Sequence, residues 1–510
     1  MSDQRCLRRA ELKGMSKRHP KIPADIDAEL SPRARKFFGD MIDDYERRIA
    51  ELMKRVEELE AKLREMEAKL QKLTPKNSSI PPSTQHPHAK ETPTPKKPKG
   101  AKKKQGGQPG HAQATRPLIP TKECDDVKIQ FPKQCRRCNG QLKGKDSKPI
   151  RHQVTELPPI KPHVTEYQLH RLLCEHCGTQ TCAQLPDAVP TGQCGPRLAA
   201  FTGLLMGHFR QSKRRAASFL SDLLNVPCSP AWTVKIQSRV SDALAAPHEE
   251  LRSELQNQKQ LFIDESPTKQ NKSKAWLWVA VAPMFAVFGI FLSRKREALQ
   301  QFVGKYKGII INCDRAKMYF DGKRLQWCWS HLKRDIQKLI DSPNGQVKRL
   351  GHDLMRQQRL LFEQWRLYKA EEITWNSFRK SIAPIRTEFN SLLLRGRFSG
   401  NDQLYGMCAE LHTRREWLWT FTKVKGIEPT NNTAERALRP AVIYRKLSFG
   451  TQSASGSRFI ERILTVSETC RMQNRSPYEY LVETMEAHFA KKPAPSLLPK
   501  KELAVNRKTA

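Results

Sequence analysis

Acidic side chains are scarce relative to basic ones in this chain of 510 residues. It carries 52 Asp and Glu against 91 Lys and Arg, which leaves a formal charge of +39. A charge of this size does not specify a fold, but it favours a polyanionic partner. The length exceeds that of one ordinary domain and indicates three or four domains.

An apolar targeting segment is also missing from the start of the chain. The first ten residues, MSDQRCLRRA, contain no hydrophobic stretch of the kind that secretory signals carry. The 13 cysteines are an odd number. We therefore expect free or metal-bound thiols in a reducing cytoplasm, not a disulfide framework.

Only one long run lacks charge, and it does not have the pattern of a membrane helix. The run AWLWVAVAPMFAVFGIFL covers residues 275–292, which is long enough to span a bilayer. Pro283 lies at its middle, however, and Val, Ile, Trp and Phe are dense on both sides, which favours two buried strands joined by a tight turn. A single span would also divide an otherwise basic, polar chain, so we expect no membrane partner.

Residues 45–73 have the clearest periodicity in the chain. Apolar residues recur there at alternating spacings of four and three, with Glu, Lys and Arg at most other positions. They are Tyr45, Ile49, Leu52, Val56, Leu59, Leu63, Met66, Leu70 and Leu73. This heptad seam predicts a coiled coil and a homo-oligomer. The alternative is one amphipathic helix that lies on the protein's own core.

Residues 74–110 are rich in Pro, Lys, Ser and Gly, and this composition predicts a flexible linker. Its basic run can contact DNA phosphates, although a solvated linker explains the same composition. The run consists of Lys96, Lys97, Lys99, Lys102, Lys103 and Lys104.

Two CxxC motifs follow the linker. CRRC provides Cys135 and Cys138, and CEHC provides Cys174 and Cys177, with an alternating, strand-like stretch between them. Two such turns can complete a tetrahedral structural Zn²⁺ site, which predicts a zinc-ribbon-like module. The exact ligand set stays open, because His176 can replace a thiolate. Residues 195–246 read as helices with a short turn, and they suit either a helix-turn-helix or an ordinary helical hairpin.

Three acidic residues are candidates for catalysis. LFIDES is a short apolar strand that ends in Asp264, and GIIINCD is a buried strand that ends in Asp314. Glu435 lies in PTNNTAERALRP, near the start of a predicted helix. It can equally form a capping box with Asn432, or pair with Arg439 one turn later. Glu265 would point to the opposite side of its strand from Asp264, which makes it a poorer metal ligand.

The predicted order of elements brings these acids together. Strand–strand–strand–helix–strand–helix is the order of a ribonuclease H-like sheet, in which the first and fourth strands are neighbours. Asp264 and Asp314 would then project side by side, with the helix of Glu435 beside them. Three converging carboxylates require cations, and hard oxygen ligands suit two ions of Mg²⁺ or Mn²⁺. Such a site can catalyse phosphoryl transfer on DNA.

Several motifs resemble the transposases of the insertion sequence 66 family, which have a DDE catalytic domain. They are GGQPGH, IDES, NCDRAKMY, CWSHLKRD and NNTAERALRP…SFGTQSASGSRF, together with the CxxC pair and the heptads. The resemblance covers roughly residues 40–485. It implies DNA transposition, with Asp264, Asp314 and Glu435 as the acidic triad.

The resemblance also implies partners and further residues. Arg436 and Arg439 would lie beside the scissile phosphate or support the helix. The DNA partners would be the terminal inverted repeats and the target, with small accessory proteins of the same element, in the bacterial cytoplasm near the nucleoid. Ser266 stands where the family usually has Thr, and Arg315 begins a pair that is usually Gly-Tyr. His331 is a weak candidate, because a packed histidine at a helix start is as good an explanation.

We therefore expect a multidomain α+β protein that acts as a metal-dependent transposase. The expected segments are an N-terminal segment (1–39), a coiled-coil helix (40–73), a basic linker (74–123), a zinc-binding domain (124–194), a helical DNA-binding region (195–255), a ribonuclease H-like catalytic domain (256–490) with a helical insertion at about 330–428, and a basic tail (491–510). The alternatives are a non-catalytic DNA-binding relative and a nuclease of the same fold.

Overall fold

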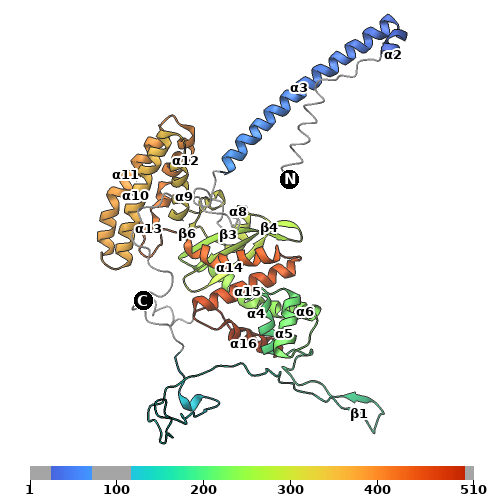
Figure 1. The fold of residues 1–510 in the computed structure, drawn as a ribbon, viewed down its shortest axis with the longest axis vertical. Helices are drawn as coiled ribbons and strands as arrows, with labels where there is room; N and C mark the ends of the chain where they lie inside the picture. Colours follow the sequence, from blue (N-terminus) through green and yellow to red (C-terminus); the bar gives the residue numbers. More distant parts are fainter. Residues whose placement is uncertain (1–23, 72–116, 500–510) are drawn as a thin grey trace.

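The structure, a computed structural model, describes residues 24–71 and 117–499 (Figure 1). The first range contains the short helix α2 (Ala24–Glu29) and the long helix α3 (Pro32–Gln71), which projects away from the rest of the chain. α3 begins ahead of the expected start at residue 40, with Pro32 at its first position, where the missing N–H of proline has no consequence. Leu73 and the Lys96–Lys104 run lie outside the described residues.

Residues 117–194 contain little regular structure. They hold a 3₁₀ turn (Thr121–Glu123) and the antiparallel hairpin of β1 (Arg171–Leu173) and β2 (Gln180–Cys182). The longer strand-like stretch that the sequence indicates at 152–174 is wrong except at its end, where β1 lies. Pro158, Pro159 and Pro162 interrupt that stretch, and proline cannot donate to a strand ladder.

A group of four helices precedes the sheet. They are α4 (Pro196–Met206), α5 (Lys213–Leu224), α6 (Pro230–Ala243) and α7 (Ala245–Glu254). Ser229 caps α6 by accepting a hydrogen bond from the Trp232 N–H, with Pro230 at the first helical position. The start of α6 therefore combines a serine N-cap with a proline at the first helical position.

A five-stranded sheet forms the centre of the body. Its strands are β3 (Gln260–Gln270), β4 (Ser273–Val281), β5 (Ala286–Phe291), β6 (Ile310–Cys313) and β7 (Leu325–Trp327), with α8 (Arg296–Val303) between β5 and β6. The spatial order is β5-β4-β3-β6-β7, antiparallel from β5 to β3 and parallel from β3 to β7. The uncharged run therefore forms β4 and β5, as predicted, and no helix in the described ranges is long and apolar enough to cross a membrane.

Helices surround the sheet. A bundle at one end lies between β7 and α14 in the chain, and it corresponds to the expected insertion (Figure 1). It consists of α9 (Trp329–Ile340), α10 (Gly345–Lys369), α11 (Trp375–Arg397), α12 (Asp402–Thr413), a 3₁₀ turn (Arg415–Leu418) and α13 (Thr420–Lys423). The chain then continues through α14 (Asn432–Ser448), α15 (Ala454–Met472) and α16 (Pro477–Phe489).

The helices α14 and α15 pack directly on the sheet. α14 contacts β3 and β4, and α15 contacts β5. Thr465 and Thr469 of α15 accept hydrogen bonds from the backbone N–H groups of Phe288 and Ala286. Because α14 itself contacts β3, its position is fixed relative to the strand that carries Asp264.

Candidate active site

Two of the predicted acids lie at one edge of the sheet. Asp264 lies in β3 and Asp314 directly follows β6, and these neighbouring strands run parallel, with Phe262 opposite Asn312. The expected strand end at Asp264 is wrong, because β3 continues to Gln270, where it still pairs with β4. Asp264 and Asp314 each lie two residues beyond the Phe262–Asn312 pair, so the parallel register brings them side by side. Asp264 accepts a hydrogen bond from the Glu265 N–H (3.0 Å), and Asp314 accepts one from the Ala316 N–H (2.8 Å).

Glu435 approaches the same edge from the first turn of α14. The capping box expected with Asn432 is wrong: the helix is capped at Asn431, without a side-chain cap bond. Asn431 is instead buried and serves as a tether. Its Nδ2 donates to the Ile263 carbonyl (2.8 Å), next to Asp264, and its backbone N–H donates to Cys328 Sγ (3.1 Å).

The electrostatics of the three acids show that they interact. Burial raises the pKa of Asp264 well above its usual range, and the negative charges of Glu265, Asp314 and Glu435 raise it further. Burial also raises the pKa of Asp314, while the Ala316 N–H and nearby arginines oppose that shift. Like charges held this close favour either a bound proton or a bound cation.

Glu265 occupies a different environment from Asp264. Its side chain is 1% exposed and accepts hydrogen bonds from Arg294 Nε (2.7 Å) and the Tyr319 hydroxyl (2.6 Å). Burial and the charge of Asp314 raise its pKa to about 7. Because Arg294 and Tyr319 already donate to its two oxygens, Glu265 stabilises the residues next to the site and does not offer a free oxygen to a metal ion.

Arg315 does not project toward the acids or into solvent. Its guanidinium forms ion pairs with Asp335 of α9 (2.7 Å) and Glu410 of α12 (3.0 Å). This arginine therefore ties the loop after Asp314 to the helical bundle. Nothing in the sequence pairs Arg315 with these two distant acids.

His331 lies against Glu435. Its Nδ1 is 3.5 Å from Glu435 Oε1, and no hydrogen-bond partner is found for either atom within the described part of the chain. Burial lowers the pKa of His331 to about 3, with further lowering by Arg334 and Arg315, so the ring is neutral at neutral pH. Cys328, His331 and Glu435 offer ligand atoms that all lie within 4.8 Å of one another.

Both arginines that follow Glu435 are exposed on α14. The expected pairing of Glu435 with Arg439 is not found among the described residues, where the neutral His331 is the side chain next to Glu435. Arg436 and Arg439 are thus free to face a ligand approaching this helix.

Each CxxC motif forms a tight turn of the same design. The Cys135 N–H donates to the Gly140 carbonyl and the Asn139 N–H donates back to the Cys135 carbonyl. The same pair of bonds recurs from Cys174 to Thr179 and from Gly178 to Cys174. Hydrogen bonds lower the pKa of the Cys135 and Cys177 thiols.

The structure does not join these two turns into one group of ligands. Among the described residues, one group of three candidate metal ligands has all its ligand atoms within 4.8 Å of one another. It consists of Cys328, His331 and Glu435. The Zn²⁺ site of Cys135, Cys138, Cys174 and Cys177 therefore stays a prediction, with each half already folded as a knuckle.

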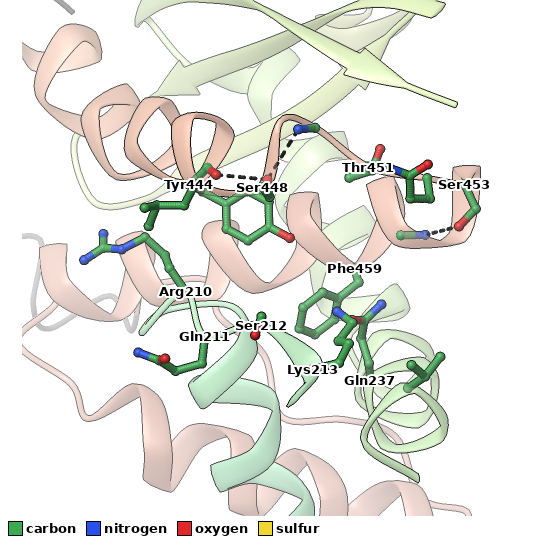
Figure 2. Close-up of a pocket in the computed structure, with 15 residues that line it drawn as sticks. Arg210, Gln211, Ser212, Lys213, Gln237, Tyr444, Ser448, Thr451, Ser453 and Phe459 are labelled. Carbon is green, nitrogen blue, oxygen red and sulfur yellow. Dashed lines mark hydrogen bonds between the residues drawn. The ribbon is translucent and has the colours of Figure 1, made fainter. Parts of the chain in front are cut away.

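A hollow of about 390 Å³ with a mixed polar and apolar lining lies near the far end of α14 (Figure 2). Arg210 and Lys213 line it from the side of α5, and Ser448, Thr451 and Ser453 line it from the turn between α14 and α15. No acidic residue lines this hollow. The sequence analysis missed it, although SFGTQSASGSRF, one of the motifs that carried the resemblance, forms one wall.

Comparisons with known proteins identify the family of the chain. The architecture is a mixed α+β protein that gathers acidic side chains at one sheet edge. Residues 192–458, more than half of the chain, match the family model "Transposase IS66 family", and the chain belongs to that family. Residues 30–117 match a family of unknown function, DUF6444.

Two curated relatives come from Sinorhizobium fredii. The uncharacterized protein y4qI is 25% identical over 261 residues, which are 44% of this chain and 47% of the relative. The uncharacterized protein y4jO is 27% identical over 158 residues, 30% of this chain and 46% of the relative. The chain thus spans just under half the length of each of these relatives.

Proposed function

We propose that this protein is a DDE-type DNA transposase that cleaves the ends of its insertion element and transfers the strands to target DNA. The observation that carries the proposal is the parallel pairing of β3 with β6, which places Asp264 beside Asp314 where the charge of Glu435 also acts. Membership of the transposase family supports the same function.

The strand order supports a ribonuclease H-like catalytic domain over 256–490. Three antiparallel strands followed by a parallel fourth strand beside the first are the arrangement that such a domain requires. In this proposal the helices α9–α13 are its insertion, residues 124–194 bind zinc, and 195–255 contact DNA through the α5–α6 pair.

The carboxylates at this part of the sheet are the donor type that a hard divalent cation takes, although among the described residues the ligand atoms of Asp264, Asp314 and Glu435 do not all lie within 4.8 Å of one another. The donors are carboxylates from three separate elements, and the pKa of Asp264 is raised by burial and by its acidic neighbours, which a cation would offset. Asp264, Asp314 and Glu435 would hold Mg²⁺ or Mn²⁺. Bound there, the ions would activate the attacking oxygen and stabilise the leaving oxygen at phosphate.

The remaining parts of the site orient the acids and the DNA. Asn431 fixes the start of α14 to β3, and Arg315 holds the loop of Asp314 against the bundle. Arg436 and Arg439 are exposed next to Glu435 and would contact phosphates. Cations outside the site, including Arg210, Lys213 and the Lys96–Lys104 run, would add affinity that salt weakens.

The test is cleavage of a labelled duplex that carries the element's own ends, with Mg²⁺ or Mn²⁺. Glu435→Gln, Asp264→Asn and Asp314→Asn should each reduce cleavage roughly 10³-fold or more, and their effects should not add because the acids act as one unit. The matched control is Glu428→Gln, a half-buried acid near α14 whose carboxylate pairs with Lys369 (3.2 Å). It should cleave at the wild-type rate.

The outcomes separate the alternatives. A folded Glu435→Gln variant that cleaves at nearly the wild-type rate would move the chemistry to other residues. A wild-type protein that binds the ends but never cleaves would be a non-catalytic relative. Cleavage without joined products would identify a nuclease of the same fold.

A further inference from the structure

Three side chains of different chemistry meet beside the acidic edge. Cys328 precedes the first residue of α9, His331 lies in its first turn, and Glu435 lies in the first turn of α14. Their ligand atoms all lie within 4.8 Å of one another. A sulfur, an imidazole nitrogen and a carboxylate oxygen at this separation match the donors that proteins use for Zn²⁺.

Two of these donor atoms are left without hydrogen bonds. His331 Nδ1 and Glu435 Oε1 are shielded from solvent, lie 3.5 Å apart, and have no hydrogen-bond partner that the described ranges provide. A buried polar atom without a partner costs about 1–3 kcal/mol, so such atoms usually have one. One cation between them would coordinate both.

Burial and the charge of Glu435 raise the pKa of the Cys328 thiol to about 11, and backbone N–H groups directed at the sulfur oppose that rise. The Asn431 N–H donates to Cys328 Sγ (3.1 Å), and the N–H groups of Ser330 and His331 are also directed at it. The thiolate is the form of cysteine that binds metals, and backbone N–H groups at a helix start stabilise it. The Cys328 side chain is buried, while Glu435 is 37% exposed, which leaves a route from solvent.

We infer that Cys328, His331 and Glu435 bind one ion of the Zn²⁺ class, with a fourth position left for water. A thiolate and an imidazole select Zn²⁺ or Co²⁺ over Mg²⁺. This site is separate from the zinc site predicted at the CxxC turns, and it shares only Glu435 with the acidic triad.

Because Glu435 belongs to both sites, Zn²⁺ bound here should affect DNA cleavage, an expectation that rests on the proposed function. A carboxylate that binds Zn²⁺ between α9 and α14 is withdrawn from Asp264 and Asp314. Stoichiometric Zn²⁺ should therefore slow Mg²⁺-dependent cleavage by the wild-type protein. Unchanged cleavage in Zn²⁺ would overturn this consequence, while the binding measurement below is independent of any cleavage.

The binding test counts tightly bound metal in the full chain. Metal-free protein is dialysed against Zn²⁺ and analysed, and Co²⁺ is used in parallel because a Co²⁺–thiolate bond gives a near-ultraviolet charge-transfer band. Cys328→Ser and His331→Gln should each bind one equivalent fewer than wild type. Cys408→Ser is the matched control, since Cys408 is a buried thiol in α12, outside the three-residue group.

Melting temperatures measured without metal separate loss of a ligand from loss of the fold. His331→Gln keeps a side chain of similar size, so it serves where Cys328→Ser is unstable. One equivalent lost from a folded variant, with Cys408→Ser unchanged, supports the site. Folded variants that keep the wild-type number of equivalents and the same cobalt band would overturn it.

Discussion

At the scale of single residues, the adjacent pair Asn431 and Asn432 shows how the site is positioned. Asn431 is buried and bonds to the Ile263 carbonyl and to Cys328 Sγ, whereas Asn432 is exposed and only accepts a hydrogen bond from the Ser330 hydroxyl (3.1 Å). The first asparagine therefore joins α14 to β3 and to the start of α9. The second lies at the surface.

Asn431→Ala should destabilise the protein by about 1–3 kcal/mol, because it leaves the buried Ile263 carbonyl without its donor. Cleavage should fall further than stability explains, since α14 would no longer hold Glu435 in register with Asp264. Thermal unfolding and end cleavage of the same preparation measure both effects. Asn432→Ala is the control and should change stability by less than about 0.5 kcal/mol. Equal effects at the two positions would refute the tether.

Asp264 predicts a pH dependence of stability in the absence of divalent cations. Its folded-state pKa lies above the unfolded value, so the folded protein binds the proton more tightly. Stability should therefore fall as the pH rises from about 4 through the folded-state pKa. Asp264→Asn removes this penalty and should melt above wild type at pH 7, with a gap that narrows toward pH 4.

Calorimetry with and without Mg²⁺ measures this effect. Added Mg²⁺ should raise the melting temperature of wild type and leave Asp264→Asn unchanged. The exposed Asp222→Asn should behave as wild type throughout. A metal-free Asp264→Asn that melts below wild type at pH 7 would contradict the raised pKa.

The candidate acids were predictable from sequence, but their supports were not. Both acids follow short apolar runs that the sequence shows, although only Asp314 lies at a strand end, since β3 continues past Asp264 to Gln270. The partners of Asn431 and Arg315 come from elements far along the chain, so no local pattern indicates them. The capping box failed for the same reason, because tertiary hydrogen bonds fixed the helix start at Asn431.

At the scale of elements, close packing joins the helices before the sheet to those after it. Gly207 at the end of α4 lies against Ile463 of α15, and a Cβ built on Gly207 would overlap that side chain. Arg462 of α15 donates to the Ser241 carbonyl of α6 (2.8 Å). The helix that covers β5 is thus also the surface on which α4 and α6 pack.

Gly207→Ala should destabilise the protein by about 1–3 kcal/mol, because the extra methyl group has no space beside Ile463. Gly406→Ala provides the matched control. Gly406 lies inside α12 with open space at its Cβ position, so alanine should stabilise that helix by about 0.5–1 kcal/mol. Chemical unfolding of both variants would show opposite signs if the packing is as described, and the same sign if it is not.

The sequence predicted elements well where pattern and burial agree. Strands β4 and β5 were predictable from an uncharged run because both are mostly buried, β5 beneath α15 although it is an edge strand. Residues 152–170 alternate in polarity but form no strand, since their prolines and the lack of a neighbouring strand remove the ladder. Alternation predicts a strand only where another strand can pair with it.

At the scale of the whole molecule, the first part of the α3 seam, from Tyr45 to Leu59, is not covered by any part of the chain that the structure describes. Tyr45, Ile49, Leu52, Val56 and Leu59 have side chains that are between 51% and 62% exposed. The helix projects away from the body of the chain, so the protein's own core does not cover this seam (Figure 1). That placement disfavours one of the two interpretations left open by the heptads, a helix lying on the core, and leaves self-association as our prediction.

Association through α3 would also strengthen DNA binding. Two chains joined at this helix present two sets of basic residues, so the second DNA contact forms at a high effective concentration. The net charge of +39 then acts on two DNA segments at once. A chain with polar substitutions in the α3 seam should keep the fold of its sheet and surrounding helices but should bind DNA less tightly.

Replacing Leu52 and Leu59 together with Asp should therefore give a monomer. Burying one leucine contributes about 1.5–3 kcal/mol, so two losses should weaken association at least ~100-fold. Sedimentation equilibrium of the full chain at rising concentration measures the change. Ala50→Asp is the matched control, because Ala50 is exposed on α3 outside the predicted seam and should leave the oligomer intact. A wild-type chain that stays monomeric at high concentration, or an equal loss in Ala50→Asp, would show that the seam does not join two copies.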